Sequence, residues 1–534
     1  MNRMELRKKQ IMIASNILGF LTIIVLGYII GDLGITYFAA AVEVYMLMHL
    51  IFTMALPDVV ARFFKSRIAK GQYKNAGVVI KAAAGYGIAI GLIGSLLLLA
   101  LSGVIAGKVL GMAEATGVIR IFAPLFLVNA ICSVFLGYFQ GIKMVVPTMI
   151  FAVLKEIFGL IFAVIFGIYL HNYGEKVSAL LHSEKYASLY GAEGAAAGMF
   201  ISMLFVLCFL SFLYFVSNRK LKKNQAEGMR RSEDAPELVR RILLSVAPVA
   251  VLHFLTRAEV FAGLFFFGKS NTGNLEKLTE YGSYYSEFFA VTGILITIGM
   301  LVTCAIEGVI VQAYKKEEYK NTRDFLQKGI QALVLVSFYF AGLFPAIGPS
   351  LFKVLFKDDT ISSLCMSHGF FIIVFFPMGI FFSRILMNIG KKNRVLLAAL
   401  ASFVASVVVM ALLQKRLNGS VLIPLYGQLV FALVFCGTCG VMLFRLTHYN
   451  PEWIRIFALP ALASAIMGLG IILIRKALVV LVGDLVTCLV ALIAGTFCYL
   501  VLIFVFRCIR KKDLYMMPGN KFLEKMEKIF HIFG

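Results

Sequence analysis

Runs of about twenty apolar residues recur along the whole chain, and this feature limits most strongly what the chain can fold into. About 20 such residues, wound into a helix, cross the hydrocarbon core of a bilayer. The composition agrees, because 60% of the 534 residues are apolar and only 15% are charged, whereas a soluble domain has about 25% charged residues. The sequence predicts a membrane protein and excludes a disordered chain, a secreted disulfide scaffold and a cytosolic enzyme.

We predict an all-α, polytopic fold with about 14 transmembrane helices. The expected spans are residues 11–31, 38–62, 80–106, 117–140, 146–169, 194–216, 241–268, 284–311, 325–348, 364–388, 394–413, 421–444, 455–474 and 477–506. The basic start of the chain, Met1 to Lys9, leads into a first apolar run that is too long for a signal peptide, so we expect it to be retained.

The positive charges orient these spans. The formal net charge is +23, and 36 of the 51 lysines and arginines fall in segments that are cytoplasmic if both termini are, against 12 in the outer segments. Cytoplasmic loops of membrane proteins carry such an excess. We therefore expect both termini in the cytoplasm and contact with anionic membrane lipid, and no nucleic-acid partner.

Two loop motifs indicate an internal repeat. The loop at residues 70–75 and the loop at 316–321 share four of six residues at an offset of 246, and a weaker pair, 138–143 and 387–392, has an offset of 249. Parallel repeats of this kind are typical of alternating-access transporters. The predicted parts are an N-lobe (1–216), a basic cytoplasmic linker (217–240), a C-lobe (241–444), two added spans (445–506) and a cytoplasmic amphipathic tail (507–534).

The turn between the fourth and fifth spans carries a motif, GYFQGIKMVVPT, which contains Gly137, Gln140, Gly141 and Pro147. A shorter motif, Asn16-Ile-Leu-Gly19-Phe20, lies in the first span. In both motifs the sequence resembles the polysaccharide-biosynthesis flippases, the stage V sporulation protein B-like family. That family belongs to the multidrug/oligosaccharidyl-lipid/polysaccharide (MOP) exporter superfamily, which includes the lipid II flippase.

The resemblance implies two six-helix lobes related by pseudo-symmetry, with a central cavity and two C-terminal helices, as in MATE-like proteins. It also implies a bacterial cytoplasmic membrane and matches Glu156 to an acidic position of the family. One departure concerns the first span, where relatives commonly carry a basic residue and this chain has Leu21-Thr22-Ile23-Ile24.

Charges inside spans are costly and need a partner, a cavity or a role. His253 and Arg257 are four residues apart and share a helix face, where Arg257 is suited to bind a pyrophosphate bidentately. The alternative is an Arg257 that is neutralised by an acid on another helix. Arg62 and Arg384 are further candidates for a headgroup cavity.

Four acids in the spans are candidates for ion coupling or for pairing helices: Glu43, Glu156, Glu259 and Glu307. Lys155 and Glu156 are adjacent and point about 100° apart on a helix, so we expect no tidy pair between them. Nine cysteines lie singly or as one CxxC inside apolar runs, and we expect neither a metal site nor a cofactor.

The leading hypothesis is a flippase that moves a polyprenyl-(pyro)phosphate-linked oligosaccharide or peptidoglycan precursor for cell-envelope polysaccharide synthesis. The alternative in the same fold is a MATE-type multidrug exporter coupled to H+ or Na+, which would use the acids. A membrane glycosyltransferase needs acids in an outer loop, and Asp358-Asp359 is the only close pair there, so we expect no enzyme. We expect a monomer that uses a coupling ion or the membrane potential and cooperates with cell-envelope glycosyltransferases or polymerases.

Overall fold

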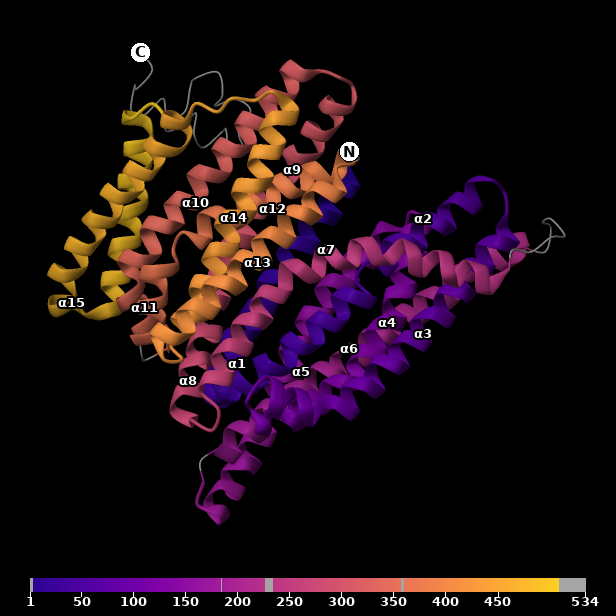
Figure 1. Ribbon diagram of the computed structural model, residues 1–534, viewed down its shortest axis with the longest axis horizontal. Helices are drawn as coiled ribbons and strands as arrows, with labels where there is room; N and C mark the ends of the chain where they lie inside the picture. Colours follow the sequence, from indigo (N-terminus) through magenta and orange to yellow (C-terminus); the bar gives the residue numbers. More distant parts are fainter. Residues whose placement is uncertain (1–2, 184, 226–233, 357–359, 509–534) are drawn as a thin grey trace. The chain divides into compact units, whose positions relative to one another are not determined.

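The computed structural model describes residues 3–183, 185–225, 234–356 and 360–508, and within them the ordered elements are all helical (Figure 1). By their contacts the residues divide into two compact units. Among the described residues, the first unit comprises 3–286 and 410–424, and the second comprises 287–409 and 425–508. The helices of the first unit are α1 (Arg3–Phe52), α2 (Leu56–Ala69), α3 (Tyr73–Gly103), α4 (Thr116–Gly141), α5 (Val145–Leu181), α6 (Lys185–Gln225), α7 (Ala235–Ser270) and α8 (Leu275–Ser283).

The second unit begins near the start of α9 and contains both arms of the last helix. Its helices are α9 (Ala290–Lys315), α10 (Tyr319–Phe356), α11 (Thr360–Gly369), α12 (Ile372–Asn388), most of α13 (Lys392–Leu417), most of α14 (Leu422–Thr447) and α15 (Leu459–Val505). The short turn between α13 and α14 belongs to the first unit.

Ten described helical segments are long and apolar enough to cross a membrane, and α11 with α12, bent by 53°, makes an eleventh. The chain is therefore a multi-pass membrane protein. Two of the ten segments, of 66 and 52 residues, are long enough for two bilayer crossings. They include α1 and α15, and each of these helices contains a glycine with non-helical backbone angles. The exact number of fourteen spans stays a prediction.

Gly31 interrupts α1 and Gly483 interrupts α15. Their backbone angles are φ 70°, ψ 169° and φ 76°, ψ 172°, a region that essentially only glycine occupies. At Gly31 the sequence places the end of the first span. In α15 the sequence places the boundary between the last two spans at 474–477, several residues before the observed bend.

The internal repeat is visible in two pairs of turns. Gly71 and Glu317, 246 residues apart, both have positive φ, and the residues around them form the same series of backbone hydrogen bonds. Lys143 and Gly390 form the second pair, with φ of 60° and 90° and again matching hydrogen bonds. Their offset is 247 residues. The sequence comparison aligned Gly141 with Gly390 and gave an offset of 249, which the structure corrects. The repeat is therefore nearly constant in length.

Gly137 and Gly141 of the family motif allow α4 to pack closely on α2. A Cβ atom on Gly137 would lie 2.6 Å from Val60 Cβ, and one on Gly141 would lie 2.7 Å from Phe64 Cδ1. Both pairs are spaced four residues apart, so they follow one face of each helix. Close approach through small residues is the usual packing of transmembrane helices. These motif glycines thus act in packing within the first unit.

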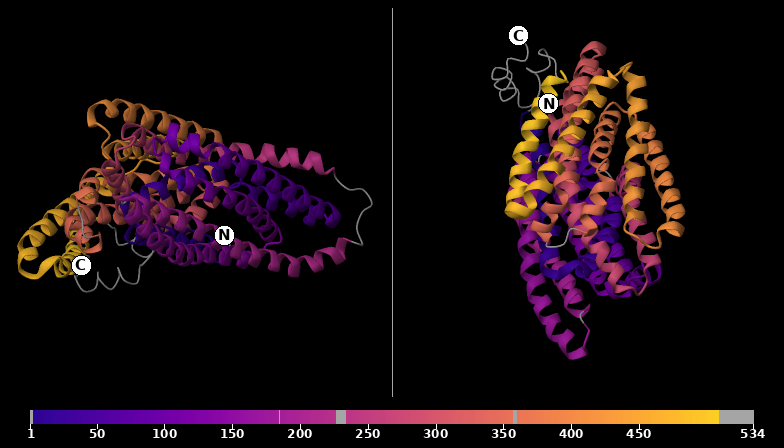
Figure 2. Two further views of the ribbon diagram at one scale, coloured as in Figure 1. Left: turned by 90° about the horizontal axis from the view of Figure 1, so that it is seen from below. Right: turned by 90° about the vertical axis from the view of Figure 1, so that its left-hand side faces the viewer.

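One hydrophobic core of the second unit lies between α10 and the two arms of α15 (Figures 1 and 2). The arms run side by side, and a Cβ atom on Gly495 would lie 2.5 Å from Ile471 Cδ1. Tyr499 donates a hydrogen bond of 2.7 Å to the Leu335 carbonyl of α10, and Ser464 donates one of 2.6 Å to Phe338. The two added spans are therefore fixed to α10 by buried polar contacts as well as by apolar packing.

The predicted linker, 217–240, is partly helical, because α6 continues to Gln225 and α7 begins at Ala235. The predicted amphipathic tail falls almost entirely on residues 509–534, outside the described residues. The proposed lobe boundaries stay predictions.

Candidate functional site

A buried ion pair joins α1 to α7. Arg257 Nε donates a hydrogen bond of 2.9 Å to Glu43 Oε2, and Arg257 Nη2 donates a second one to Glu43 Oε1. The Tyr285 hydroxyl donates a third, of 2.9 Å, to the same Oε1. The Glu43 side chain is fully buried, and 26% of the Arg257 side chain is exposed. In this structure Arg257 is neutralised by an acid on another helix, the alternative that the sequence left open.

The other candidate acids have different surroundings. Glu307 of α9 is buried and accepts a hydrogen bond of 3.2 Å from Asn388 Nδ2 of α12. Glu259 of α7 is buried too, and its Oε2 has no hydrogen-bond partner in the structure. A buried carboxylate oxygen without a partner is costly. Glu259 is therefore the one acid of the four with an unsatisfied buried oxygen in the described part of the chain.

Lys155 and Glu156 of α5 do form an ion pair, contrary to the sequence expectation. Lys155 Nζ lies 3.1 Å from Glu156 Oε1. The helical angle between them is bridged because the lysine stem is long and flexible. The carboxylate also lies against α1, since a Cβ atom on Gly19 would be 3.0 Å from Glu156 Oε2. This contact joins the acidic position of the family to the glycine of the first-span motif.

A buried polar network, which sequence reasoning missed, surrounds His49 of α1. Asn129 Nδ2 of α4 lies 2.7 Å from the Tyr45 hydroxyl and 2.8 Å from His49 Nδ1. The Thr53 hydroxyl lies 2.5 Å from the same Nδ1. Helix α1 ends at Phe52, directly at this network, and α2 begins at Leu56. The spacing of His49, Thr53 and Pro57 was a signal for this break in the second predicted span.

The part of α1 that follows Gly31, which we call its second arm, packs against α7, and the two helices run antiparallel. We call their line of contact the α1–α7 seam. Glu43 faces Arg257 in the ion pair. His49 lies six residues after Glu43 on α1, and His253 lies four residues before Arg257 on α7. The two helices of the seam thus carry three basic side chains, those of His49, His253 and Arg257.

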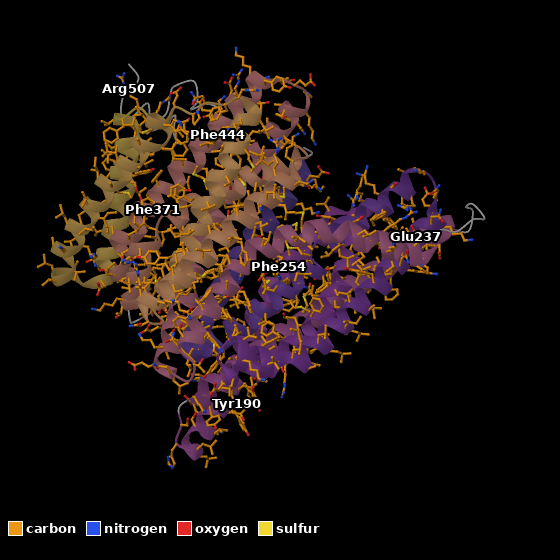
Figure 3. The ribbon with its side chains drawn as sticks, in the orientation of Figure 1. Tyr190, Glu237, Phe254, Phe371, Phe444 and Arg507 are labelled. Carbon is orange, nitrogen blue, oxygen red and sulfur yellow. The ribbon has the colours of Figure 1, made fainter. Side chains whose placement is uncertain are left out.

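An apolar cavity of about 270 Å³ lies at the next turn of the seam. Figure 3 places Phe254 on α7 at this part of the first unit. The lining residues come from α1, α3 and α7: Ile51, Phe52, Tyr86, Leu243, Val246, Ala250, Val251 and Phe254. The Tyr86 hydroxyl is turned to the backbone, where it donates a hydrogen bond of 3.3 Å to the Phe52 carbonyl. The cavity thus presents carbon to its interior.

The remaining predicted basic residues lie elsewhere. Arg62 is exposed on α2, and its guanidinium lies 5.7 Å from the centre of the adjacent Phe63 ring. Arg384 is half-buried on α12 of the second unit. The structure brings Arg257 and His253 together with Glu43 on one seam but does not place Arg62 on it. Of the motif residues, Pro147 is buried in the first turn of α5 and Gln140 is half-buried near the end of α4.

Within the described residues, no three His, Cys, Asp or Glu side chains are arranged to hold a metal ion. The cysteines there have no disulfide partners, and seven of the nine are buried.

Comparison with known proteins gives one match by sequence and several by structure. No protein-family profile matches the chain. Lipid II flippase MurJ of Bacillus subtilis (strain 168) is 30% identical over 156 residues, which cover 28% of this chain and 29% of that protein. The alignment thus spans less than a third of the length of this curated relative.

Solved structures match over most of the chain. Lipid II flippase MurJ in an inward closed conformation has a TM-score of 0.66 at 14% identity, with 92% of this chain and 96% of that chain covered. An inward-facing multidrug resistance MATE family transporter of the MOP superfamily has a TM-score of 0.56 at 16% identity, with 84% and 96% covered. A MOP superfamily transporter from Pyrococcus furiosus Vc1 (DSM3638) has a TM-score of 0.57 at 14% identity, with 83% and 95% covered. The chain has the MOP fold, which confirms the predicted fold class.

Proposed function

We propose that this protein is a flippase that moves a polyprenyl-(pyro)phosphate-linked saccharide across the bacterial plasma membrane for cell-envelope polysaccharide synthesis. The local similarity to a protein named lipid II flippase and the shared fold support this proposal. A charged, hydrated headgroup does not cross hydrocarbon unaided, because its polar groups lose their hydrogen bonds to water. A transporter solves this with a polar, basic passage inside the bilayer.

The observation that supports the proposal most strongly is which charged side chains in the spans have partners and which remain partly exposed. Three of the four candidate acids have partners: Glu43 holds Arg257, Glu156 holds Lys155, and Glu307 accepts from Asn388. An exporter of organic cations needs acids that face its substrate. The partly exposed charges in the first two pairs are instead those of Arg257 and Lys155, which suit a phosphate.

Arg257 has a specific role in this proposal. Its guanidinium binds Glu43 in the bidentate geometry that it would also use for a phosphate. Because a quarter of the side chain is exposed, an anion can approach it without unfolding the helices. We propose that a phosphate competes with Glu43 for Arg257, so that headgroup binding loosens the contact between α1 and α7.

The energy source and the partners belong to the same proposal. Glu259, with its unsatisfied oxygen, is the acid we propose for coupling to H+ or Na+, while the membrane potential is the alternative. We further propose that the protein works as a monomer and receives its substrate from, or passes it to, membrane glycosyltransferases or polymerases of the cell envelope.

Leaflet translocation tests the proposal directly. The purified protein in proteoliposomes should move a fluorescent polyprenyl-pyrophosphate-linked sugar between leaflets. Arg257→Ala should reduce the rate at least about tenfold, because it removes a charged hydrogen bond worth about 1.5–3 kcal/mol. Lys176→Gln, on the exposed far part of α5, is the matched control and should keep the wild-type rate.

Two results would overturn the proposal. One is a folded wild-type protein that leaves the labelled lipid in its leaflet, and the other is H+- or Na+-driven export of an organic cation by the same preparation. The second result would assign the protein to the exporter alternative.

A further inference from the structure

Three helices end together at one edge of the first unit. They are α3, which continues into a short helix at Val104–Val109, then α7 and the last turns of α13. Lys269 Nζ at the end of α7 donates a hydrogen bond of 3.2 Å to the Lys108 carbonyl. Gln414 Nε2 of α13 donates one of 3.0 Å to Ser270 Oγ of α7. We call this edge the α3–α7–α13 rim.

The rim carries exposed basic side chains, which are those of Lys108, Lys269, Lys415 and Arg416. The Lys269 ammonium lies within about 6 Å of the Lys108 Cα atom, because the carbonyl oxygen that it contacts is two bonds from that atom. The flexible four-carbon stem of Lys108 spans such a distance. Both ammonium groups can therefore contact one phosphate group.

The rim charges have no acidic partners in the part of the chain that the structure describes. Other lysines of the first unit do have them. Lys185 Nζ lies 3.6 Å from Glu114 Oε1, and Lys277 Nζ lies 2.5 Å from Glu280 Oε1. Because like charges repel and the rim has no described counter-charge, its positive potential attracts an anion.

Apolar side chains on the surface lead up to the rim. On α3 and its continuation, Leu101 and Val104 are 46% and 45% exposed, and Lys108 follows at the spacing of one helix face. On α13, Leu412 is 66% exposed and lies four residues before Arg416. Each of these faces changes from apolar to basic within one turn. A phospholipid has the same profile, from acyl chains to an anionic headgroup.

We propose that the α3–α7–α13 rim binds an anionic membrane phospholipid, phosphatidylglycerol, with its phosphate at Lys108 and Lys269 and its acyl chains along Leu101 and Val104. The two basic residues at the end of α13 extend the positive surface beside it. The ligand is a component of the bilayer and not the cargo of the proposed function. The inference therefore does not depend on translocation.

The position of the rim favours a lipid over a soluble polyanion. In the predicted orientation the rim lies on the outer side, where membrane proteins carry few basic residues. Its charges continue the apolar faces of two helices, which is where a lipid headgroup lies. A lysine that only snorkels needs no basic neighbour, whereas Lys269 of α7 reaches the backbone of Lys108.

A tryptophan that is quenched by brominated lipid measures enrichment at the rim. The only tryptophan is Trp453, so Trp453→Phe with Val104→Trp places one indole four residues before Lys108. The full chain is placed in nanodiscs of phosphatidylglycerol and phosphatidylcholine, with brominated acyl chains on one of the two lipids. The binding constant should favour phosphatidylglycerol at least about fivefold, the effect of one lysine near anionic lipid. Equal quenching by the two lipids would overturn the proposal.

Variants test the two lysines. In the reporter background, Lys108→Gln with Lys269→Gln should bring the ratio of the two binding constants close to one. Lys108→Arg with Lys269→Arg should keep the preference, because a guanidinium also binds phosphate. Lys176→Gln, an exposed lysine of α5, is the control and should keep it too. An unchanged preference in the folded double glutamine variant would exclude the two lysines as phosphate ligands.

A second reporter position separates the rim from the rest of the protein surface. Ile165 on α5 is 54% exposed, and Ile165→Trp with Trp453→Phe should be quenched equally by the two brominated lipids. The same preference at this position would show that the whole surface attracts anionic lipid, and the rim would not be a site.

A soluble competitor tests the choice of occupant. Dextran sulfate, at a sulfate concentration equal to that of the phosphatidylglycerol, should leave most of the preference at Val104→Trp in place. Complete loss of the preference would assign the rim to a soluble polyanion and reject the lipid. None of these measurements includes a transport step, so a preference for phosphatidylglycerol in a protein that moves no labelled lipid would reject the proposed function and keep the rim site.

Discussion

Glu43 and Arg257, 214 residues apart in sequence, are joined by two hydrogen bonds, and the Tyr285 hydroxyl adds a third bond to the carboxylate. The pair ties the second arm of α1 to α7 and leaves the Glu43 carboxylate fully buried. Burying two charges costs free energy that their attraction only partly returns. The pair is therefore better explained by the loosening of the α1–α7 contact that its opening would allow than by a contribution to the stability of the fold.

Loss of the arginine should lower the free energy of unfolding more than loss of the carboxylate. Arg257→Met leaves a fully buried carboxylate, and we expect a loss of about 3 kcal/mol in the free energy of unfolding. Glu43→Gln leaves a guanidinium that is 26% exposed and should cost less, because water can reach the charge. Thermal unfolding in detergent measures both.

The double variant, Glu43→Gln with Arg257→Met, completes this cycle. It should be more stable than Arg257→Met alone, because no uncompensated charge is left. Additive losses would show that the two side chains do not interact in solution, and the proposed competition between phosphate and Glu43 would lose its basis.

Gly137→Ala should destabilise the first unit by about 1–3 kcal/mol, since the new methyl group would overpack the α2–α4 contact. Its Cβ would lie 2.6 Å from Val60 Cβ and 3.0 Å from the Pro57 carbonyl oxygen. Val60→Ala should restore part of the stability. Gly159→Ala is the control, because no atom lies within 4 Å of its Cβ, and it should stabilise the helix by up to about 1 kcal/mol.

Sequence reasoning reached the features that are encoded locally. Apolar runs identify the helices, and the turn at Gly71 recurs at Glu317 because both loops share local residues. It did not find the His49 network, because a histidine in an apolar helix usually indicates a satisfied core residue, and its partner Asn129 is 80 residues away. The Lys155–Glu156 pair was predicted wrongly because the angle between Cβ atoms ignores the reach of a lysine.

The partner of Arg257 was left open for the same reason. Four acids in the spans had comparable sequence contexts, and nothing local distinguishes Glu43 from Glu307. Only the packing of α1 on α7 selects Glu43. Helix existence is thus a property of a window of sequence, whereas the choice between ion-pair partners is a property of the tertiary fold.

The Cys508 thiol should resist alkylation near neutral pH. Burial raises the pKa of this thiol to about 11, although the nearby Arg455 guanidinium acts to lower it. Cys508 follows the last span, which ends at Val505. The reactive species is the thiolate, and at pH 8 only about one thiol in a thousand with this pKa is ionised, against about a quarter at the usual 8.5.

Site-resolved mass spectrometry after maleimide treatment measures this reactivity. The labelling rate should rise about tenfold per pH unit between pH 8 and 10, because the thiolate fraction does. Arg455→Gln should slow the reaction further, since it removes the positive charge that favours the thiolate. Rapid labelling of the folded wild-type protein at pH 7 would contradict the buried position of Cys508.

The bend of α15 should depend on Gly483. With φ 76° and ψ 172°, Gly483→Ala imposes a backbone conformation that costs about 1–3 kcal/mol for a residue with a Cβ atom. No atom lies within 4 Å of that Cβ, so a clash contributes nothing and the effect is purely conformational. Gly470→Ala is the matched control, because it is equally open but helical, and it should be neutral or stabilising.

Thermal unfolding of the two variants in detergent compares them under identical conditions. A lower Tm for Gly483→Ala alone would show that the two arms of α15 need this backbone conformation to reach α10, where Tyr499 and Ser464 make their buried hydrogen bonds. Equal Tm values would mean that the arms bend elsewhere, and the boundary that the sequence placed at residues 474–477 would then be the better one.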